Sequence, residues 1–226
     1  MKKIKSYAKI NLFLKVTKQL KNFYKLHSLI VQINLYDEIL IKENSKKKNI
    51  IFFLGKYKAN RQNNTVINLL NLMKKKFSSL RYKNFDIYIK KNIPNGSGLG
   101  GASSNAATVF NFIKRKYKLK ISDKESRKLL AKIGKDCPLF LNQKVKLITS
   151  SGEKFTEFKD NPKLNMLLIY PNLALSTKKV FNKLEKISKI SLKGSINFKD
   201  KKKLLEVCKY YGNDLLDPAI QIEPRL

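Results

Sequence analysis

Hydrophobic and polar residues alternate over several stretches in the first part of the chain. Alternation or apolar, β-branched character at 5–16, 28–42 and 49–54 predicts three strands. From residue 65 the apolar positions recur at helical spacing, which predicts a helix. The stretch 85–93 alternates again, so it predicts a strand that leads into the glycine-rich segment after it.

Beyond residue 93 the pattern becomes mainly helical. Small residues followed by helically spaced apolar ones predict a helix over 103–118. Ser122 and Glu125 form a capping box that starts another helix, which ends near Gly134. The remaining predictions are a hairpin with "SSGE" (150–153) at its turn, a strand at 166–170, and helices near 176–188 and 200–211.

This order of elements is typical of an α+β protein, with strands gathered early and helices interspersed later. A chain of 226 residues is long enough for two lobes around a substantial core. We predict a boundary near 145–165 and divide the chain into lobes at 1–150 and 151–226.

Charge adds one alternative to this picture. The net charge is +33, from 49 basic and 16 acidic residues, and such a surface attracts nucleic acid. However, only five of the basic residues are arginine, and the lysines are scattered along the whole chain. Because Lys, Asn, Ile, Phe and Tyr are all plentiful, we favour compositional drift toward AT-rich codons over a specific nucleic-acid footprint.

Compartment and membrane signals are weak. Cys137 and Cys208 lack metal-like spacing and form no disulfide framework, which favours a reducing, cytoplasmic setting. The sequence has no run of about eighteen apolar residues, so we predict no membrane span. The opening "MKKIKSYAKINLFLKVT" reads as an alternating strand, since lysines interrupt its apolar run and no small-residue cleavage site follows.

The segment "GSGLGG" (96–101) places four of the chain's nine glycines in six positions. It satisfies G-x-G-x-x-G, but the acid at the distance expected for a dinucleotide fold, Asp123, lies in a capping box rather than at the end of a strand. A P-loop is excluded because no Gly-Lys-Ser/Thr closes the segment. What remains is a strand, a glycine loop and a helix that carries Ser103 and Ser104 in its first turn. Free N–H groups at a helix N-terminus bind phosphate, and this interpretation accounts for more glycines than a simple cap requires.

The stretch "PNGSGLGGASSNAA" (94–107) resembles the ATP-binding motif of the GHMP kinase superfamily. Two further stretches, "SYAKINLFLKVT" (6–17) and "KIGKDCPLFL" (132–141), resemble motifs of one family within it, the 4-diphosphocytidyl-2-C-methyl-D-erythritol kinases of isoprenoid biosynthesis. The resemblance implies a two-lobed fold, with an N-terminal lobe like the second domain of ribosomal protein S5 and a ferredoxin-like C-terminal lobe. It also implies transfer of the γ-phosphoryl group of ATP, with Mg²⁺, to the 2-hydroxyl of the substrate.

The same resemblance implies roles for individual residues. Lys9 and Asp136 are the expected catalytic pair: a carboxylate can orient or deprotonate the hydroxyl, and an ammonium can offset charge on the phosphoryl oxygens. The expected ATP-binding residues are Pro94, Asn95, Gly96, Ser97, Gly98, Leu99, Gly100, Gly101, Ala102, Ser103 and Ser104. The expected substrate-binding residues are Asn11, Tyr24, Lys25, Thr177 and Phe181, and no protein metal ligand is expected. For the two aromatic residues, core packing is the alternative.

Two stretches depart from the family pattern. Where the family has Gly-Tyr-His, this chain has "FYK" (23–25), so Lys25 stands where a histidine meets cytosine, and His27 shares its strand face. The family also continues past the equivalent of "YGNDLLDPA" into a third glycine-rich motif, so we expect the second lobe to be incomplete. The alternatives are therefore an inactive, nucleotide-binding remnant, a superfamily member acting on mevalonate, homoserine or galactose, and a basic nucleic-acid-binding protein. The expected partner is a small molecule with a cytidine diphosphate group, bound by a monomer or homodimer without specific nucleic acid or membrane contact.

Overall fold

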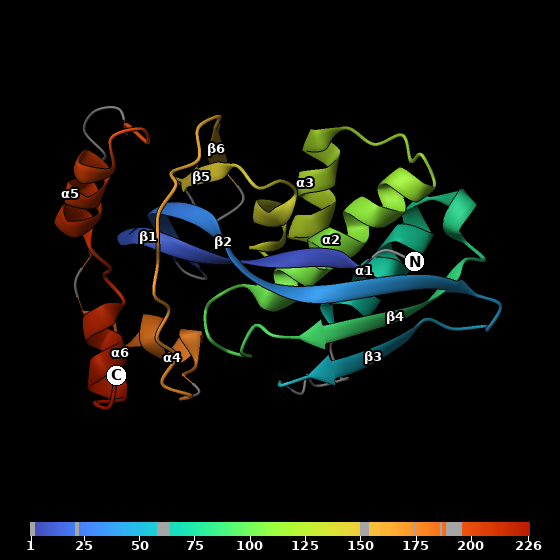
Figure 1. Cartoon of the computed structure of the whole chain (residues 1–226), viewed down its shortest axis with the longest axis horizontal. Coiled ribbons are helices and arrows are strands. Elements are labelled where there is room, and N and C mark those ends of the chain that lie inside the picture. Colours follow the sequence, from blue (N-terminus) through green and yellow to red (C-terminus); the bar gives the residue numbers. More distant parts are fainter. Residues whose placement is uncertain are drawn as a thin grey trace. The chain divides into compact units, whose positions relative to one another are not determined.

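The computed structural model describes residues 3–20, 23–57, 64–149, 154–173, 175–185, 187–188 and 196–226. The strands are β1 (Ile4–Leu20), β2 (Phe23–Asn44), β3 (Ile50–Gly55), β4 (Asn84–Lys91), β5 (Val145–Ile148) and β6 (Phe155–Phe158). The α-helices are α1 (Thr65–Lys76), α2 (Gly101–Lys116), α3 (Asp123–Ala131), α4 (Thr177–Asn182), α5 (Lys201–Tyr211) and α6 (Leu216–Ile222). Two 3₁₀ turns, η1 (Ser78–Leu80) and η2 (Cys137–Phe140), complete the described elements (Figure 1).

The strands of the described residues belong to one mixed sheet with the order β3-β4-β2-β5-β6, and β1 pairs with β2. β3 runs parallel to β4, whereas β2 pairs with both β4 and β5 in the antiparallel sense. A mixed sheet with interspersed helices confirms the predicted α+β class.

The chain divides into two compact units. The first unit comprises Met1–Ala8, Ile33–Asn95 and Leu99–Asn142, and the second comprises Lys9–Gln32, Gly96–Gly98 and Gln143–Leu226. The long strands β1 and β2 contribute residues to both units. The predicted lobe boundary at residue 150 stays a prediction.

The core of the first unit forms where α1 and α2 pack together beside β2, β4 and β3 (Figure 1). The apolar stripes of α1, α2, β2 and β4 are buried, whereas in β3 only Ile51 is buried and Leu54 is 54% exposed. On β2 and β4 the register pairs Ile39 with Ile89, and both side chains are fully buried. The helices contribute Val66, Leu69, Leu70, Met73, Val109, Phe110 and Ile113.

Most of the predicted helices and strands are confirmed. The capping box is present: Ser122 Oγ accepts a hydrogen bond from the Glu125 N–H, and the Glu125 carboxylate accepts one from the Ser122 N–H. β5 and β6 form the predicted antiparallel pair, while "SSGE" (150–153) lies outside the described residues. Helix α4 ends at Asn182, before the predicted end near residue 188.

The predicted strand at 166–170 is wrong. Residues 160–173 form neither helix nor strand, and the Leu167 and Ile169 side chains are largely exposed. The apolar composition of this stretch suits a strand, but a strand also needs a hydrogen-bonded neighbour. Within the described part of the chain this segment pairs with none.

Candidate active site

The glycine-rich segment connects the end of β4 to the start of α2. Gly96, Gly98 and Gly100 all have φ near +70°, a conformation that side chains with a Cβ rarely adopt. Gly100 is the N-cap of α2 and has no side chain to cap the helix. The first-turn N–H groups of α2 therefore form an uncapped, positively polarised helix end, which is suited to an anion such as phosphate.

Gly101 begins α2 where the helix approaches the end of β4. A Cβ added at this position would lie 3.0 Å from Ile93 Cγ2 and 3.2 Å from Lys91 Nζ. Both distances are shorter than ordinary van der Waals contacts, so any larger residue at position 101 would force the Ile93 or Lys91 side chain to shift. The glycine-rich composition thus has two separate physical causes: backbone conformation at three positions and lack of space at Gly101.

The two serines of the loop differ in their surroundings. Ser104 is 2% exposed; its Oγ donates a 2.6 Å hydrogen bond to the Tyr7 carbonyl and accepts a 2.8 Å bond from Ser6 Oγ. These bonds join α2 to β1 within the first unit. Ser103 is only partly buried and contacts the Cys137 thiol, whose pKa rises to about 11, chiefly through burial. Both serines stay predicted ATP-binding residues, but Ser104 also has a structural role.

The predicted catalytic residues belong to different units, so each is described separately. Lys9 lies on β1 in the second unit, is 9% exposed, and donates a 3.0 Å hydrogen bond from Nζ to Asn11 Oδ1. The structure therefore brings together a predicted catalytic and a predicted substrate-binding residue. The pairing of Lys9 with Asp136 stays a prediction.

Asp136 lies at the N-terminus of η2 in the first unit and is partly buried. The simplest alternative role for an aspartate before a turn is to cap it. However, the side chain makes no capping hydrogen bond at η2, and within the described residues its carboxylate accepts no hydrogen bond. This carboxylate is thus uncommitted in the described part of the fold.

Two predicted substrate-binding aromatics come together in the second unit. The Tyr24 ring from β2 stacks on the Phe181 ring from α4, with centroids 4.9 Å apart and planes 24° apart. The Tyr24 hydroxyl also donates a 3.1 Å hydrogen bond to the Phe181 carbonyl. Thr177, on the same helix, is exposed.

Lys25 and His27, which stand at the departure from the family's Gly-Tyr-His, differ in their exposure to solvent. Lys25 is exposed on β2, whereas His27 is partly buried and its Nδ1 atom is buried without a hydrogen-bond partner among the described residues. Burial lowers the pKa of His27, which favours the neutral imidazole. His27 therefore does not reproduce the exposure of Lys25.

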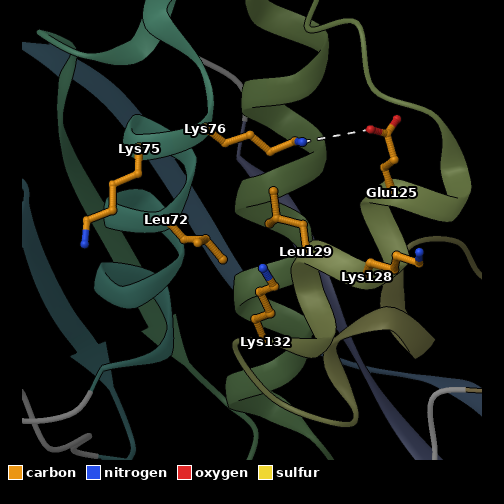
Figure 2. Close-up of a pocket in the computed structure, with 7 residues that line it drawn as sticks. All are labelled: Leu72, Lys75, Lys76, Glu125, Lys128, Leu129 and Lys132. Carbon is orange, nitrogen blue, oxygen red and sulfur yellow. Dashed lines mark ion pairs between the residues drawn. The ribbon is translucent and has the colours of Figure 1, made fainter.

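A separate hollow of about 530 Å³ lies in the first unit between α1 and α3 (Figure 2). Its lining residues are Leu72, Lys75, Lys76, Glu125, Lys128, Leu129 and Lys132. None of them is a predicted site residue. Lys76 already faces Glu125, with Nζ 3.9 Å from the carboxylate. These seven residues include no aromatic ring on which a nucleobase could stack.

Metal-ligand clusters and membrane-spanning helices are both absent from the described residues. Among the described residues, no group of three or more His, Cys, Asp or Glu side chains is arranged to hold a metal ion. None of the described helices combines the length and apolar character needed to cross a membrane.

Sequence comparison assigns the class of protein. Residues 64–142, which include the glycine loop and α2, match the family described as GHMP kinases N terminal domain. The mixed sheet, the loop with its positive-φ glycines and the uncapped helix that follows are thus those of a GHMP kinase.

Individual relatives identify the family within this superfamily. A 4-diphosphocytidyl-2-C-methyl-D-erythritol kinase of Pelagibacter ubique is 36% identical over 227 residues, which covers 99% of this chain and 78% of the relative. The enzyme of that name from Caldanaerobacter subterraneus is 32% identical, covering 94% of this chain and 74% of the relative. The chain belongs to the 4-diphosphocytidyl-2-C-methyl-D-erythritol kinase family, a family of phosphotransferases in isoprenoid biosynthesis.

Solved structures agree on the fold. A crystal structure of 4-(cytidine 5'-diphospho)-2C-methyl-D-erythritol kinase superposes with a TM-score of 0.75 at 21% identity, covering all of this chain and 80% of that one. A mevalonate kinase structure superposes less well, with a TM-score of 0.53. The fold expected from the motifs is therefore confirmed.

Asp37 is the residue of this region that the sequence patterns did not single out. It is fully buried on β2, directly beside both ends of the glycine loop. One signal in the sequence could have identified it: Asp37 has the same strand parity as Ile39 and Ile41, so the alternation places an acid on the buried face.

Proposed function

We propose that the chain transfers the γ-phosphoryl group of ATP to the 2-hydroxyl of 4-diphosphocytidyl-2-C-methyl-D-erythritol. The similarity of nearly the whole chain to two kinases of that name carries the proposal. The uncapped α2 N-terminus supports the nucleotide half, because its N–H groups suit the phosphates of ATP. Mg²⁺ would accompany those phosphates and neutralise part of their charge.

Phosphoryl transfer requires a protein mainly to position groups and to offset developing charge. We assign Asp136 to orient or deprotonate the attacking hydroxyl, since its carboxylate is not used elsewhere in the described residues. We assign the Lys9 ammonium, held by Asn11, to the phosphoryl oxygens.

The cytidine end of the substrate would meet the Tyr24–Phe181 pair. The Tyr24 ring is held in place by its stacking on Phe181 and by the hydrogen bond from its hydroxyl to the Phe181 carbonyl, so the pair offers a preformed aromatic surface. Lys25, exposed on the same strand, would supply a positive charge toward the diphosphate in place of a base-reading histidine. A cytoplasmic location and a monomeric or dimeric state stay predictions.

The test is ADP release by the purified chain with ATP and Mg²⁺, with and without the substrate. Substrate-dependent ADP release is expected. ATP binding without turnover would instead favour the inactive remnant, and absence of ATP binding would refute the phosphate role of the loop.

Variants with matched controls assign the two catalytic roles. Lys9→Met and Asp136→Asn should each lower kcat at least about a hundredfold while nearly preserving ATP affinity. Lys18→Met, an exposed lysine of the same strand, and Asp123→Asn, an exposed acid of α3, should leave kcat unchanged. Equal losses in a site variant and its control would remove that residue from the mechanism.

A further inference from the structure

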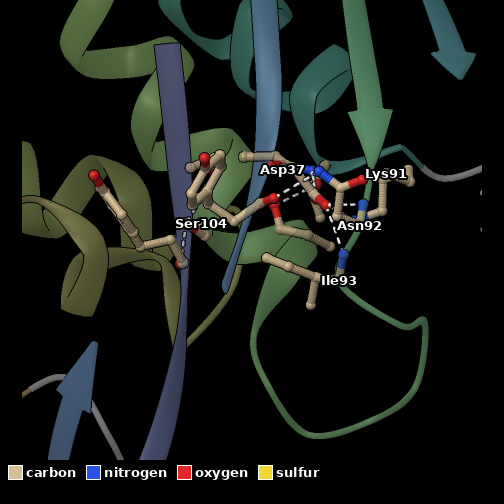
Figure 3. Close-up of polar contacts among 11 residues, drawn as sticks. Asp37, Lys91, Asn92, Ile93 and Ser104 are labelled. Carbon is tan, nitrogen blue, oxygen red and sulfur yellow. Dashed lines mark hydrogen bonds and ion pairs between the residues drawn. The ribbon is translucent and has the colours of Figure 1, made fainter. Parts of the chain in front are cut away.

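The Asp37 carboxylate accepts four hydrogen bonds in the interior of the first unit (Figure 3). Its Oδ1 atom accepts from the backbone N–H groups of Asn92 (2.8 Å) and Ile93 (2.9 Å). Its Oδ2 atom accepts from the Asn105 amide (2.9 Å) and from the Lys91 ammonium. Asp37 is fully buried and Lys91 is 3% exposed, so solvent replaces none of these bonds.

All four partners are donors, and this determines which side chain can stand at position 37. An ionised carboxylate only accepts hydrogen bonds, so both of its oxygens suit this environment. An asparagine would direct its NH₂ group at two donors in either orientation, and it would leave the buried Lys91 ammonium without a counter-charge. The geometry therefore requires an acid here.

The partners of Asp37 lie at the two ends of the glycine loop. Asn92 and Ile93 follow the last residue of β4, where the loop begins. Asn105 lies in α2, just after the loop ends at Gly101. Glycine at position 101 also lets these two ends lie close together, because a Cβ there would crowd the side chains of Ile93 and Lys91.

We propose that Asp37 is the positioning residue of the nucleotide loop: one buried carboxylate holds the entry and the exit of the glycine loop at a fixed separation. The positive-φ glycines between these ends give the segment conformational freedom, which an anchor at both ends restricts. The first-turn N–H groups of α2 are thereby held in one orientation before ATP arrives. The part of this inference that concerns ATP rests on the function proposed above.

The test compares two double variants with the same charge. Asp37→Asn/Lys91→Met removes both charges and retains an anchor: Oδ1 of the new amide accepts from Asn92 and Ile93. Its NH₂ donates to Asn105 Oδ1 once the Asn105 amide turns over, because in the parent chain the Asn105 NH₂ group faces position 37 and Oδ1 has no hydrogen-bond partner within the described part of the chain. Asp37→Ala/Lys91→Met removes the same charges and the anchor together. Neither variant contains an unpaired buried ammonium at position 91, so both are expected to fold.

Three measurements are made on each variant: hydrogen exchange of the amides of 92–105, the melting temperature and the Kd for ATP. In the Ala variant we expect faster exchange in 92–105 and about ten- to a hundredfold weaker ATP binding, the scale of losing one hydrogen bond to a charged phosphate group. The Asn variant should keep exchange near that of the parent and ATP affinity within about threefold of it. Similar exchange and affinity in the two variants would overturn the proposal.

A control separates loss of the anchor from general destabilisation. Asp214 also accepts hydrogen bonds from a backbone N–H (Val16, 2.7 Å) and a hydroxyl (Ser188, 2.8 Å) and pairs with Lys15, but it lies far from the loop and α2 in sequence and shares none of the partners of Asp37. Asp214→Asn should lower the melting temperature without changing exchange in 92–105. If it changes that exchange as much as the Ala variant does, Asp37 has no specific role. Should the parent chain bind no ATP, the proposed function fails, while the exchange data still decide whether Asp37 anchors the loop.

Discussion

The buried hydroxyl of Ser104 provides the sharpest test of how α2 is held. Ser104→Ala removes the donor to the Tyr7 carbonyl and the acceptor for the Ser6 hydroxyl, at a position that is 2% exposed. A buried polar group left without its partner costs roughly 1–3 kcal/mol. The Ser6 hydroxyl can rotate toward the Tyr7 carbonyl and recover part of this loss, so we expect a total of about 2 kcal/mol.

For a chain of this length, each kcal/mol lowers the melting temperature by about 2–4 °C, so Ser104→Ala should lower it by about 4–8 °C. Differential scanning calorimetry measures this shift, and an ATP titration is run on the same sample. The matched variant is Ser103→Ala, whose partly exposed hydroxyl should contribute less than about 0.5 kcal/mol to stability. We expect ATP binding to weaken more in Ser103→Ala than in Ser104→Ala.

A double-mutant cycle isolates the hydrogen bond between the two serines. Ser6→Ala and Ser104→Ala should be coupled by about 1 kcal/mol, because either change removes the same 2.8 Å bond. If Ser104→Ala leaves the melting temperature unchanged and abolishes ATP binding, the hydroxyl is a nucleotide ligand and the structural reasoning is wrong.

Three further predictions concern backbone conformation, pH and thiol reactivity. Gly98 has φ +73°, and a Cβ at this position would meet no heavy atom of the described residues within 4 Å. Gly98→Val should therefore weaken ATP binding through backbone strain, and Gly98→Asn should weaken it less, because asparagine tolerates this conformation better. Equal ATP affinities of the two variants in titration would contradict this. Hydrogen bonds, first of all from Lys83, lower the pKa of Glu43 to about 2. The ionised carboxylate therefore stabilises the fold fully above the unfolded pKa, and this contribution is lost as the pH falls from about 4.5 toward 2. Urea unfolding should show that the stability of Glu43→Gln depends less steeply on pH in this range than that of the parent chain. Burial raises the pKa of both thiols, that of Cys137 to about 11. Because Cys137 is fully buried and Cys208 only partly, iodoacetamide at pH 8 should label Cys208 first, and equal rates by mass spectrometry would refute this.

Local patterns in the sequence predicted the elements that depend on local physics. The capping box at Ser122 and Glu125 involves residues three apart, so its hydrogen bonds can be read from the sequence alone. The same holds for the glycines, since their composition reports the backbone conformations of the loop. The prediction of a strand at 166–170 was wrong because strand formation depends on a distant neighbour, and the segment itself carries no information about that neighbour.

Asp37 shows the same limit within the candidate site. Its partners lie 54 to 68 residues away along the chain, so no short window of the sequence contains them together. Tyr24 and Phe181 are farther apart still, and periodicity gives no reason to connect them. The family resemblance singled out both as substrate-binding residues, because a motif carries long-range information, and the structure stacks their rings together.

The scarcity of acids in this chain makes the surroundings of each acid informative. With 49 basic residues and 16 acidic ones, donors exceed carboxylates, and a carboxylate with nearby donors is readily engaged. Asp37 accepts four hydrogen bonds and Glu43 accepts from Lys83, Lys116 and Tyr117. Asp136, partly buried at the start of η2, accepts none within the described residues. The roles proposed for these two acids agree with this difference: the Asp37 carboxylate is fully engaged as an anchor, whereas the Asp136 carboxylate can still accept a hydrogen bond from a substrate hydroxyl.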